Sequence, residues 1–334
     1  MTAKYEGAAA GRGNVWVPLV VICLTVAMAA SAAIAQPAAR TEVLPVPSVT
    51  LTNQQILSGS LAGAPVTLAG ELRLPASGGG RLPAVVLVHG SGGIGANIDT
   101  WARDLNAVGI AAFILDSFTG RGIADTVTDQ SQLDELALMT DAYRALAVLS
   151  KHPRIDPKRI AVMGFSKGAV AAVYSANARF RRLYDPGGPG FAAHVGLYTP
   201  CHIRLRDDTK TTGAPIRMFH GTPDDWIPVA PCRAYVADLR KAGADVVLTE
   251  YPGAWHTYDN PTRFPPVMIP TAQSPRDCRI VEGADGKLLN EQTGAVFTFA
   301  DACMQRGAHA GFDPAAYEAT RKAVLGFLKD ALKP

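Results

Sequence analysis

Short hydrophobic runs with the composition of β-strands alternate along this chain with segments whose hydrophobic residues recur at helical spacing. Residues 83–90 and 159–166 are almost continuously hydrophobic, as expected of strands that are buried on both faces of a sheet. Residues 65–75 alternate between hydrophobic and polar positions, a pattern typical of an antiparallel edge strand. The remaining predicted strands are residues 109–118, 194–200, 215–221 and 245–253.

The predicted helices lie between or after these strands. Residues 132–150 carry hydrophobic side chains at helical spacing, and residues 229–242 do so up to Gly243, a residue type that often ends helices. A last helix is predicted over residues 313–332. Strand–helix alternation of this kind predicts an α/β fold with a mostly parallel sheet that helices cover on both faces. Ligands of such sheets bind at the carboxyl ends of the strands.

The beginning of the chain differs from the rest. Two basic residues, Lys4 and Arg12, precede a hydrophobic run, and small residues come directly before Gln36. This layout predicts a cleavable signal peptide over residues 1–35. A permanent N-terminal anchor is the alternative, because residues 16–35 are about long enough to span a bilayer.

The remainder is predicted to consist of an N-terminal leader over residues 36–60, which starts rich in Ala and Pro, and one domain over residues 61–334. The 334-residue chain has a formal net charge of +3, and removal of the signal peptide lowers it to +2. So small a charge argues against nucleic acid or an anionic membrane as a partner. No second hydrophobic run of that length follows, so we expect no stable membrane insertion after cleavage and a periplasmic or secreted location.

The segment MGFSKGA holds the first candidate for chemistry. Ser166 stands where a buried strand turns into a helical segment, with Gly164 and Gly168 on either side. This is the setting of a nucleophile elbow, in which the glycines let strand and helix approach closely. A serine hydroxyl is a good nucleophile only when a base removes its proton, so a histidine oriented by a carboxylate is needed. A purely structural turn serine is the alternative.

Both partners follow downstream in the order that such elbows require. Asp224 lies after one predicted strand and His256 after the next, so we expect both on loops at the same edge of the sheet as Ser166. Asp225 is the alternative acid. The oxyanion formed by attack on a carbonyl needs preorganised N–H donors.

The predicted donors are two backbone amides. One belongs to Lys167, the residue after the nucleophile, and the other to Ser91 in the glycine-rich turn VHGSGG. Arg121 and Trp226 are candidate substrate-binding residues. A solvated charge for Arg121 and a packing role for Trp226 are the alternatives.

At this point the chain resembles the α/β-hydrolase fold and, within it, the dienelactone hydrolase family. The resemblance rests on LVHGSGGIG, ILDSFTGRG, GFSKGA, HGTPDDWIP and YPGAWH, which occur in this order over residues 83–260. In the family pattern H-G-x-x-D-x-x-[VI]-P the acid corresponds to Asp224. Family members proper have a cysteine nucleophile where this chain has Ser166 and a glutamate where it has Gly90.

The resemblance implies a hydrolase for small-molecule carboxylic esters or lactones. With Ser166 as the nucleophile and the predicted signal peptide, we expect an exported serine hydrolase. Its acyl-serine mechanism needs no metal and no organic cofactor. Two kinds of alternative remain open. The same three residues serve amide or peptide hydrolysis and acyl transfer, and a non-catalytic binding protein could retain the fold.

The cysteines make a further prediction. More than fifty residues separate His256 from the last predicted helix, and we expect an inserted flap there at about 260–311, with short strands between its two cysteines. Four cysteines remain after signal removal, an even number in an oxidising compartment. We predict the disulfides Cys201–Cys232 and Cys278–Cys303; four buried thiols are the alternative.

Overall fold

The computed structural model describes residues 40–76 and 80–333, so the predicted signal peptide lies outside the described residues. An eight-stranded sheet in the order β1-β2-β4-β3-β5-β6-β8-β9 forms the centre of this part. The strands from β4 to β9 are parallel, and β1 and β2 are antiparallel additions at one edge. The strands are β1 (Arg40–Thr50), β2 (Ala64–Leu74), β3 (Leu82–Val88), β4 (Ala111–Asp116), β5 (Ile155–Phe165), β6 (His194–Leu197), β8 (Ile216–Gly221) and β9 (Val246–Tyr251).

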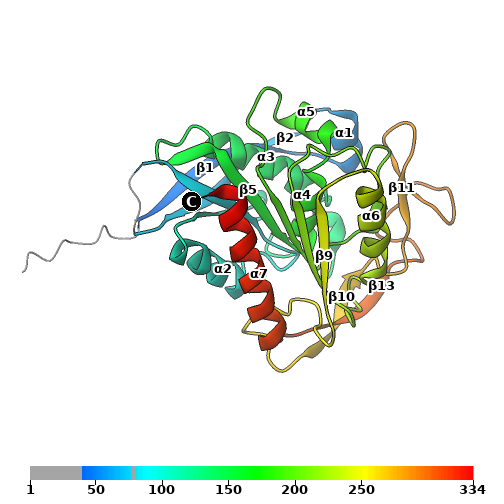
Figure 1. Cartoon of the computed structure of the whole chain (residues 1–334). Coiled ribbons are helices and arrows are strands. Elements are labelled where there is room, and N and C mark those ends of the chain that lie inside the picture. Colours follow the sequence, from blue (N-terminus) through cyan, green and yellow to red (C-terminus); the bar gives the residue numbers. More distant parts are fainter. Residues whose placement is uncertain (1–39, 77–79, 334) are drawn as a thin grey trace, which may run out of the picture. The chain divides into compact units, whose positions relative to one another are not determined.

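Helices cover the sheet on both faces, as the sequence predicts (Figure 1). α2 and α7 pack on one face, while α3, α4 and α6 pack on the other. The helices are α1 (Asn53–Ser58), α2 (Ala96–Ala107), α3 (Ala137–Leu149), α4 (Lys167–Tyr174), α5 (Ala178–Tyr184), α6 (Ala230–Lys241) and α7 (Pro314–Leu332), with short 3-10 turns at η1 (Thr119–Arg121) and η2 (Gln130–Gln132). The fold class is therefore the predicted α/β class.

The two hydrophobic cores explain why the central strands read as continuous hydrophobic runs. Every residue of β3 is buried, because its side chains point alternately into the core under α3 and the core under α2. Val85 pairs with Ala112 of β4, and Val88 pairs with Gly164 of β5. This register brings the carboxyl ends of β3 and β5 side by side.

The predicted leader is wrong for residues 40–60, because these residues belong to the folded domain. β1 pairs with β2 along its whole length, from Arg40 opposite Leu74 to Thr50 opposite Ala64. Two prolines, Pro45 and Pro47, make the segment resemble a leader. Proline lacks an N–H group and is tolerated on an edge strand, where one side of the backbone needs no partner, and β1 is such a strand.

The predicted flap is present between the loop that carries His256 and α7. It contains β10 (Val267–Ser274), which pairs with β13 (Gln305–Ala310), and β11 (Ile280–Glu282), which pairs with β12 (Leu288–Asn290). β11 also pairs with β7 (Ile203–Arg204), which follows β6 of the main domain. The flap is thus joined to the domain by a shared small sheet.

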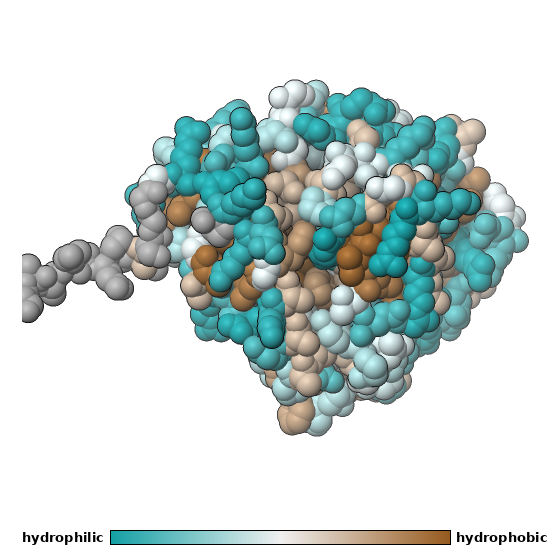
Figure 2. All heavy atoms as spheres, viewed as in Figure 1, coloured by the Kyte–Doolittle hydropathy of each residue, from teal (hydrophilic) through white to brown (hydrophobic). Residues whose placement is uncertain are grey.

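The surface seen in Figure 2 is mostly hydrophilic, with small hydrophobic areas between the polar ones. Within residues 40–76 and 80–333, no helix has the length and hydrophobicity that crossing a membrane requires.

Candidate active site

Ser166 occupies a sharp turn between β5 and α4. Its backbone has φ 52° and ψ −120°, in the positive-φ region that a residue with a side chain rarely adopts. The flanking glycines allow the turn: a Cβ on Gly164 would come within 2.0 Å of the Gly168 carbonyl oxygen, and a Cβ on Gly168 within 2.1 Å of the Val88 carbonyl oxygen. The geometry is that of the predicted nucleophile elbow.

The structure brings Ser166, His256 and Asp224 together from three strand ends at the same edge of the sheet. The Ser166 hydroxyl lies 2.9 Å from His256 Nε2, and His256 Nδ1 lies 2.8 Å from Asp224 Oδ2. Because a carboxylate only accepts hydrogen bonds, Nδ1–H donates to Asp224 and Nε2 is left to accept from Ser166. β5, β8 and β9 precede these three residues, and their carboxyl ends meet at one edge of the sheet.

Asp224 is held as a buried carboxylate. Its Oδ1 accepts hydrogen bonds from the backbone amides of Trp226 (3.0 Å) and Ile227 (2.9 Å). Burial alone would raise the pKa of Asp224, but the neighbouring His256 and His220 outweigh it, so this pKa lies below its usual range. Asp224 therefore keeps its negative charge next to His256 across the ordinary pH range.

The alternative acid, Asp225, lies elsewhere. Its carboxylate accepts hydrogen bonds from the backbone amide and from the imidazole of His309 in the flap. It makes no contact with His256. The geometry thus favours Asp224 over Asp225 as the partner of the candidate base.

The predicted oxyanion donors lie next to Ser166. The backbone amides of Ser91 and Lys167 donate to no acceptor within the described part of the chain, so both are available to a ligand. The Ser91 hydroxyl, by contrast, is bonded to the Gln130 side chain at 3.1 Å. Helix α4 begins at Lys167, so the positive end of its dipole also faces this position.

Arg121 does not line the candidate site, which corrects its tentative role in substrate binding. Both of its terminal nitrogens contact Asp141, and its other donors bind Ser117 O, Val49 O and Thr50 Oγ1. All five N–H groups of the guanidinium are thereby used, and its side chain is only 4% exposed. Arg121, in η1, thus connects β1 to α3, and its pair with Asp141 is a structural ion pair.

Trp226 lies in the wall of the site, and its role in substrate binding stays a prediction. Its ring centre lies 4.9 Å from that of His256, and its indole N–H donates to Gln273 O in the flap. Trp226 and Ser166 both line two cavities, which we name the outer and the inner cavity. The outer cavity, of about 110 Å³, has His256 in its wall, while the inner cavity, of about 20 Å³, does not.

Several residues of the site carry no recognisable sequence signal. Glu135 and His202 line the inner cavity, and Asp259 accepts from Trp101 Nε1, Tyr198 Oη and Asn97 Nδ2 beneath the loop of His256. Glu135 and His202 are remote from the motifs in sequence, so only the fold places them here. Asp259 holds the loop that carries His256 in place. Its position three residues after His256 is the one sequence feature that suggests this role. No cluster of three or more His, Cys, Asp or Glu among the described residues is arranged to hold a metal ion.

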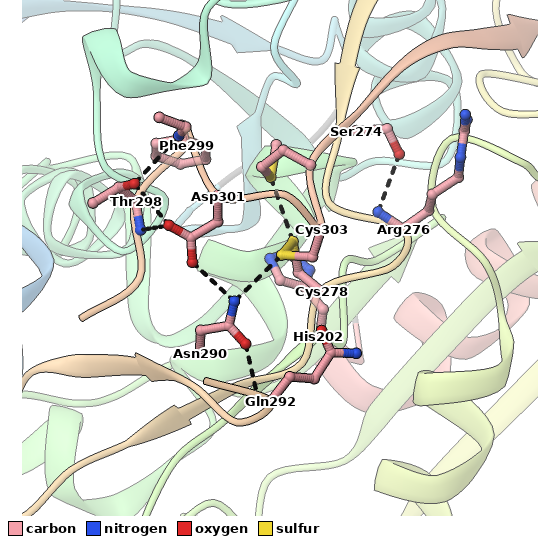
Figure 3. Close-up of a disulfide and its surroundings, with 12 residues drawn as sticks. His202, Ser274, Arg276, Cys278, Asn290, Gln292, Thr298, Phe299, Asp301 and Cys303 are labelled. Carbon is pink, nitrogen blue, oxygen red and sulfur yellow. Dashed lines mark hydrogen bonds between the residues drawn. A yellow bond between two sulfur atoms is a disulfide. The ribbon is translucent and has the colours of Figure 1, made fainter. Parts of the chain in front are cut away.

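Both predicted disulfides are confirmed. Cys201 is bonded to Cys232 of α6, and Cys278 is bonded to Cys303 inside the flap. Figure 3 shows the second bond with Asn290 beside it, whose amide donates to Asp301 at 2.9 Å. The first disulfide ties the segment after β6 to the helix that follows the Asp224 loop.

Comparison with known proteins places these features in a wider group. A model of the dienelactone hydrolase family matches residues 68–276. A probable 2-oxo-3-(5-oxofuran-2-ylidene)propanoate lactonase of Bradyrhizobium sp is 24% identical over 194 residues, which cover 54% of this chain and 74% of the relative.

Among solved structures, a dienelactone hydrolase-like promiscuous phosphotriesterase from metagenomic libraries is similar with a TM-score of 0.54 and 16% identity, over 87% of this chain and 98% of that one. Esterase 2 of Thermogutta terrifontis, phosphonylated by cyclosarin, is similar with a TM-score of 0.51 and 18% identity, over 69% of this chain and 88% of that one. At these identities the structural likeness shows the fold.

Proposed function

The chain belongs to the dienelactone hydrolase family, and from this premise we propose that it is an exported serine hydrolase that cleaves carboxylic esters or lactones. The observation that carries the proposal is the 2.9 Å contact between Ser166 Oγ and His256 Nε2 at a strained elbow, with Asp224 behind the imidazole. The lactonase and esterase names of the similar proteins support an ester or lactone as the substrate.

The proposed reaction has two halves. As Ser166 Oγ attacks the carbonyl carbon, His256 Nε2 takes the hydroxyl proton, and Asp224 stabilises the imidazolium that forms. The amides of Ser91 and Lys167 hold the oxyanion of the tetrahedral intermediate. His256 then donates its proton to the leaving oxygen, which frees the alcohol and leaves an acyl group on Ser166.

The second half repeats these roles with water. His256 takes a proton from the water as it attacks the acyl carbon, and returns it to Ser166 Oγ as the acid leaves. Every group in this scheme belongs to the chain itself. An amide substrate would use the same atoms, so esters and amides are separated only by experiment.

Labelling with a fluorophosphonate probe tests whether Ser166 is a nucleophile. We expect the wild-type protein to be labelled at Ser166 and the Ser166→Ala variant to be unlabelled, with kcat on a phenyl ester lowered by at least about 10³-fold. A phenyl ester and the matching anilide, assayed side by side, compare ester with amide cleavage. Labelling that persists in Ser166→Ala, or turnover above about a tenth of wild type, would overturn the proposal.

Export is supported by the two disulfides, which form and persist in oxidising compartments. Mass spectrometry of the protein recovered from a bacterial periplasm tests it. We expect a mature chain that begins at Gln36. A full-length chain recovered with the membrane fraction would favour the permanent anchor instead.

A further inference from the structure

The inner cavity beside Ser166 is small, and its wall combines hydrophobic with ionisable side chains. Its volume of about 20 Å³ has room for one water-sized group. Most cavities of this size beside a nucleophile would be expected to have a hydrophobic wall, because acyl chains are hydrophobic. Here three ionisable side chains contribute to the wall: Glu135, Lys167 and His202.

The position of His256 identifies which half of the substrate faces this cavity. In the proposed reaction His256 protonates the leaving oxygen, so the leaving group must lie against the imidazole. The outer cavity has His256 in its wall and is the one that suits the leaving group. Ser91 lines both cavities, but the inner cavity has Lys167 and not His256 in its wall, so it faces the acyl group.

The three ionisable side chains are buried and incompletely bonded. Lys167 is 3% exposed, and its Nζ donates to Gln130 O at 3.1 Å and lies 3.5 Å from Thr126 Oγ1, which leaves one of its three donors free. Glu135 and His202 approach each other at 3.3 Å, without the alignment of a hydrogen bond. The carboxylate atom in this approach is Oε1. Glu135 Oε2 and His202 Nε2 have no hydrogen-bond partner in the described part of the chain.

Glu135 Oε2 is a buried acceptor without a partner, and the Lys167 ammonium has a donor that is not used. Leaving both unbonded is costly, so a ligand that satisfies both is favoured. The local charge limits what that ligand can be. Burial would raise the pKa of Glu135, but His202 and Lys167 lower it below its usual range, so the cavity already contains a carboxylate. A second carboxylate would be repelled by it. A neutral group that both donates and accepts fits best.

We propose that this cavity binds the hydroxyl of a short hydroxyacyl group, which donates to Glu135 Oε2 and accepts from the Lys167 ammonium. The proposal rests on the proposed function, because it assigns the acyl side of that reaction. Because the cavity is small, the acyl group must be short and carry its hydroxyl on the carbon adjacent to the carbonyl, as in a hydroxyacetyl ester. Glu135 and Lys167 then act as specificity-determining residues.

Four phenyl esters test this assignment on the intact protein: hydroxyacetate, propanoate, methoxyacetate and hydrogen malonate. Hydroxyacetate and propanoate differ only by OH in place of CH₃, methoxyacetate retains the electron-withdrawing oxygen but cannot donate, and malonate adds a carboxylate. Each kcat/KM is divided by the rate constant of hydroxide-catalysed hydrolysis of the same ester, which removes differences in intrinsic reactivity. We expect the corrected value for hydroxyacetate to exceed that for each of the others by at least about tenfold.

Two variants locate the effect. Glu135→Gln retains the shape of the side chain, and we expect it to lower the hydroxyacetate-to-propanoate ratio by at least about fivefold. Asp134→Asn is the matched control, because it also removes a negative charge that acts on Lys167, yet its carboxylate accepts from the Asn53 amide and does not line the cavity. We expect it to leave the ratio unchanged.

The outcomes distinguish a failure of the proposed hydroxyl-binding cavity from a failure of the proposed hydrolase function. Equal corrected values for hydroxyacetate and propanoate in the wild-type protein would mean that the cavity holds no more than a water, and would overturn the subsite while leaving the hydrolase intact. A preference for malonate would overturn it in favour of an anion site. If no ester is cleaved in a Ser166-dependent way, it is the proposed function that fails. The wild-type comparison stands even if a variant does not fold.

Discussion

The Asp225 carboxylate binds His309, which lies 84 residues further along the chain, through a 2.8 Å bond from the backbone amide and a 2.7 Å bond from imidazole Nδ1. Its neighbour Asp224 binds His256 instead. We therefore expect Asp224→Asn to lower kcat on an activated ester by about 10⁴-fold, because the amide no longer selects the required imidazole tautomer. Asp225→Asn should lower it by less than about tenfold, since the change loosens only a contact to the flap.

Steady-state kinetics on the two variants compares them directly. Circular dichroism provides the control that both are folded. Equal losses, or a larger loss for Asp225→Asn, would transfer the role of the acid to Asp225.

The backbone of Ser166 makes a prediction about stability. Its φ of 52° strains any residue with a Cβ, at a cost of about 1–3 kcal/mol, whereas glycine tolerates such angles. We expect Ser166→Gly to have a free energy of unfolding about 1 kcal/mol higher than that of Ser166→Ala, although both variants are inactive. Urea denaturation measures the difference. If Ser166→Ala is the more stable of the two, the elbow is not strained in solution.

Lys167 provides a prediction of pH dependence. Burial lowers its pKa from 10.5 to about 8, against the opposing effect of Glu135, Asp134 and Asp129. Between pH 8 and 10.5 the unfolded chain binds this proton and the folded chain does not, so the contribution of Lys167 to stability rises with pH in that window. We expect the free energy of unfolding of the wild type, relative to Lys167→Met, to increase by about 2 kcal/mol from pH 7 to pH 9.5.

Urea denaturation of both proteins across this range provides the measurement. The Lys167→Met variant is the control for the wild type, because the two proteins share all other titrating groups. A difference that does not change with pH, or that decreases, would show that the ammonium is solvated rather than buried.

The two disulfides are expected to stabilise different parts of the protein. They close segments with sequence separations of 31 and 25 residues, and loops of this length correspond to about 3–4 kcal/mol each. Only the Cys278–Cys303 bond lies within the flap that supplies Gln273 and Phe299 to the inner cavity. We expect the double variant Cys278→Ser/Cys303→Ser to lose esterase activity at a lower urea concentration than the one at which its main sheet unfolds.

The variant Cys201→Ser/Cys232→Ser is the matched comparison, and for it we expect activity and sheet structure to be lost together. Activity and far-ultraviolet circular dichroism, followed in the same urea series, distinguish the two cases. Coincident transitions in both variants would show that the flap does not unfold separately.

The sequence was sufficient for features that depend on local pattern. Buried strands such as β3 and β5 and the elbow at Ser166 each have a signature within a few residues, and motif order assigned Asp224 and His256. It failed at β1, where Pro45 and Pro47 disguise an edge strand, because whether proline is tolerated depends on which side of the strand is paired. Arg121 was misassigned for a related reason, since its partner Asp141 lies on a distant helix.

The inner cavity shows the same limit more clearly. Glu135, Lys167 and His202 come from three separate segments, and nothing in their local sequence indicates a shared wall. The parallel strands β5 and β6 place Lys167 and His202 near each other, and the segment between η2 and α3 adds Glu135.

The contacts of the flap have a consequence for the order in which the protein becomes active during synthesis. Ser166, Asp224 and His256 have all been translated by residue 256, but the partners that hold their loops come later: Gln273 and Ser274 on Trp226, and Gly311 on the His256 carbonyl oxygen. A nascent chain that ends before the flap therefore contains every reacting group without the contacts that fix them. We expect hydrolytic activity to appear only once the last fifth of the chain has folded back onto the sheet.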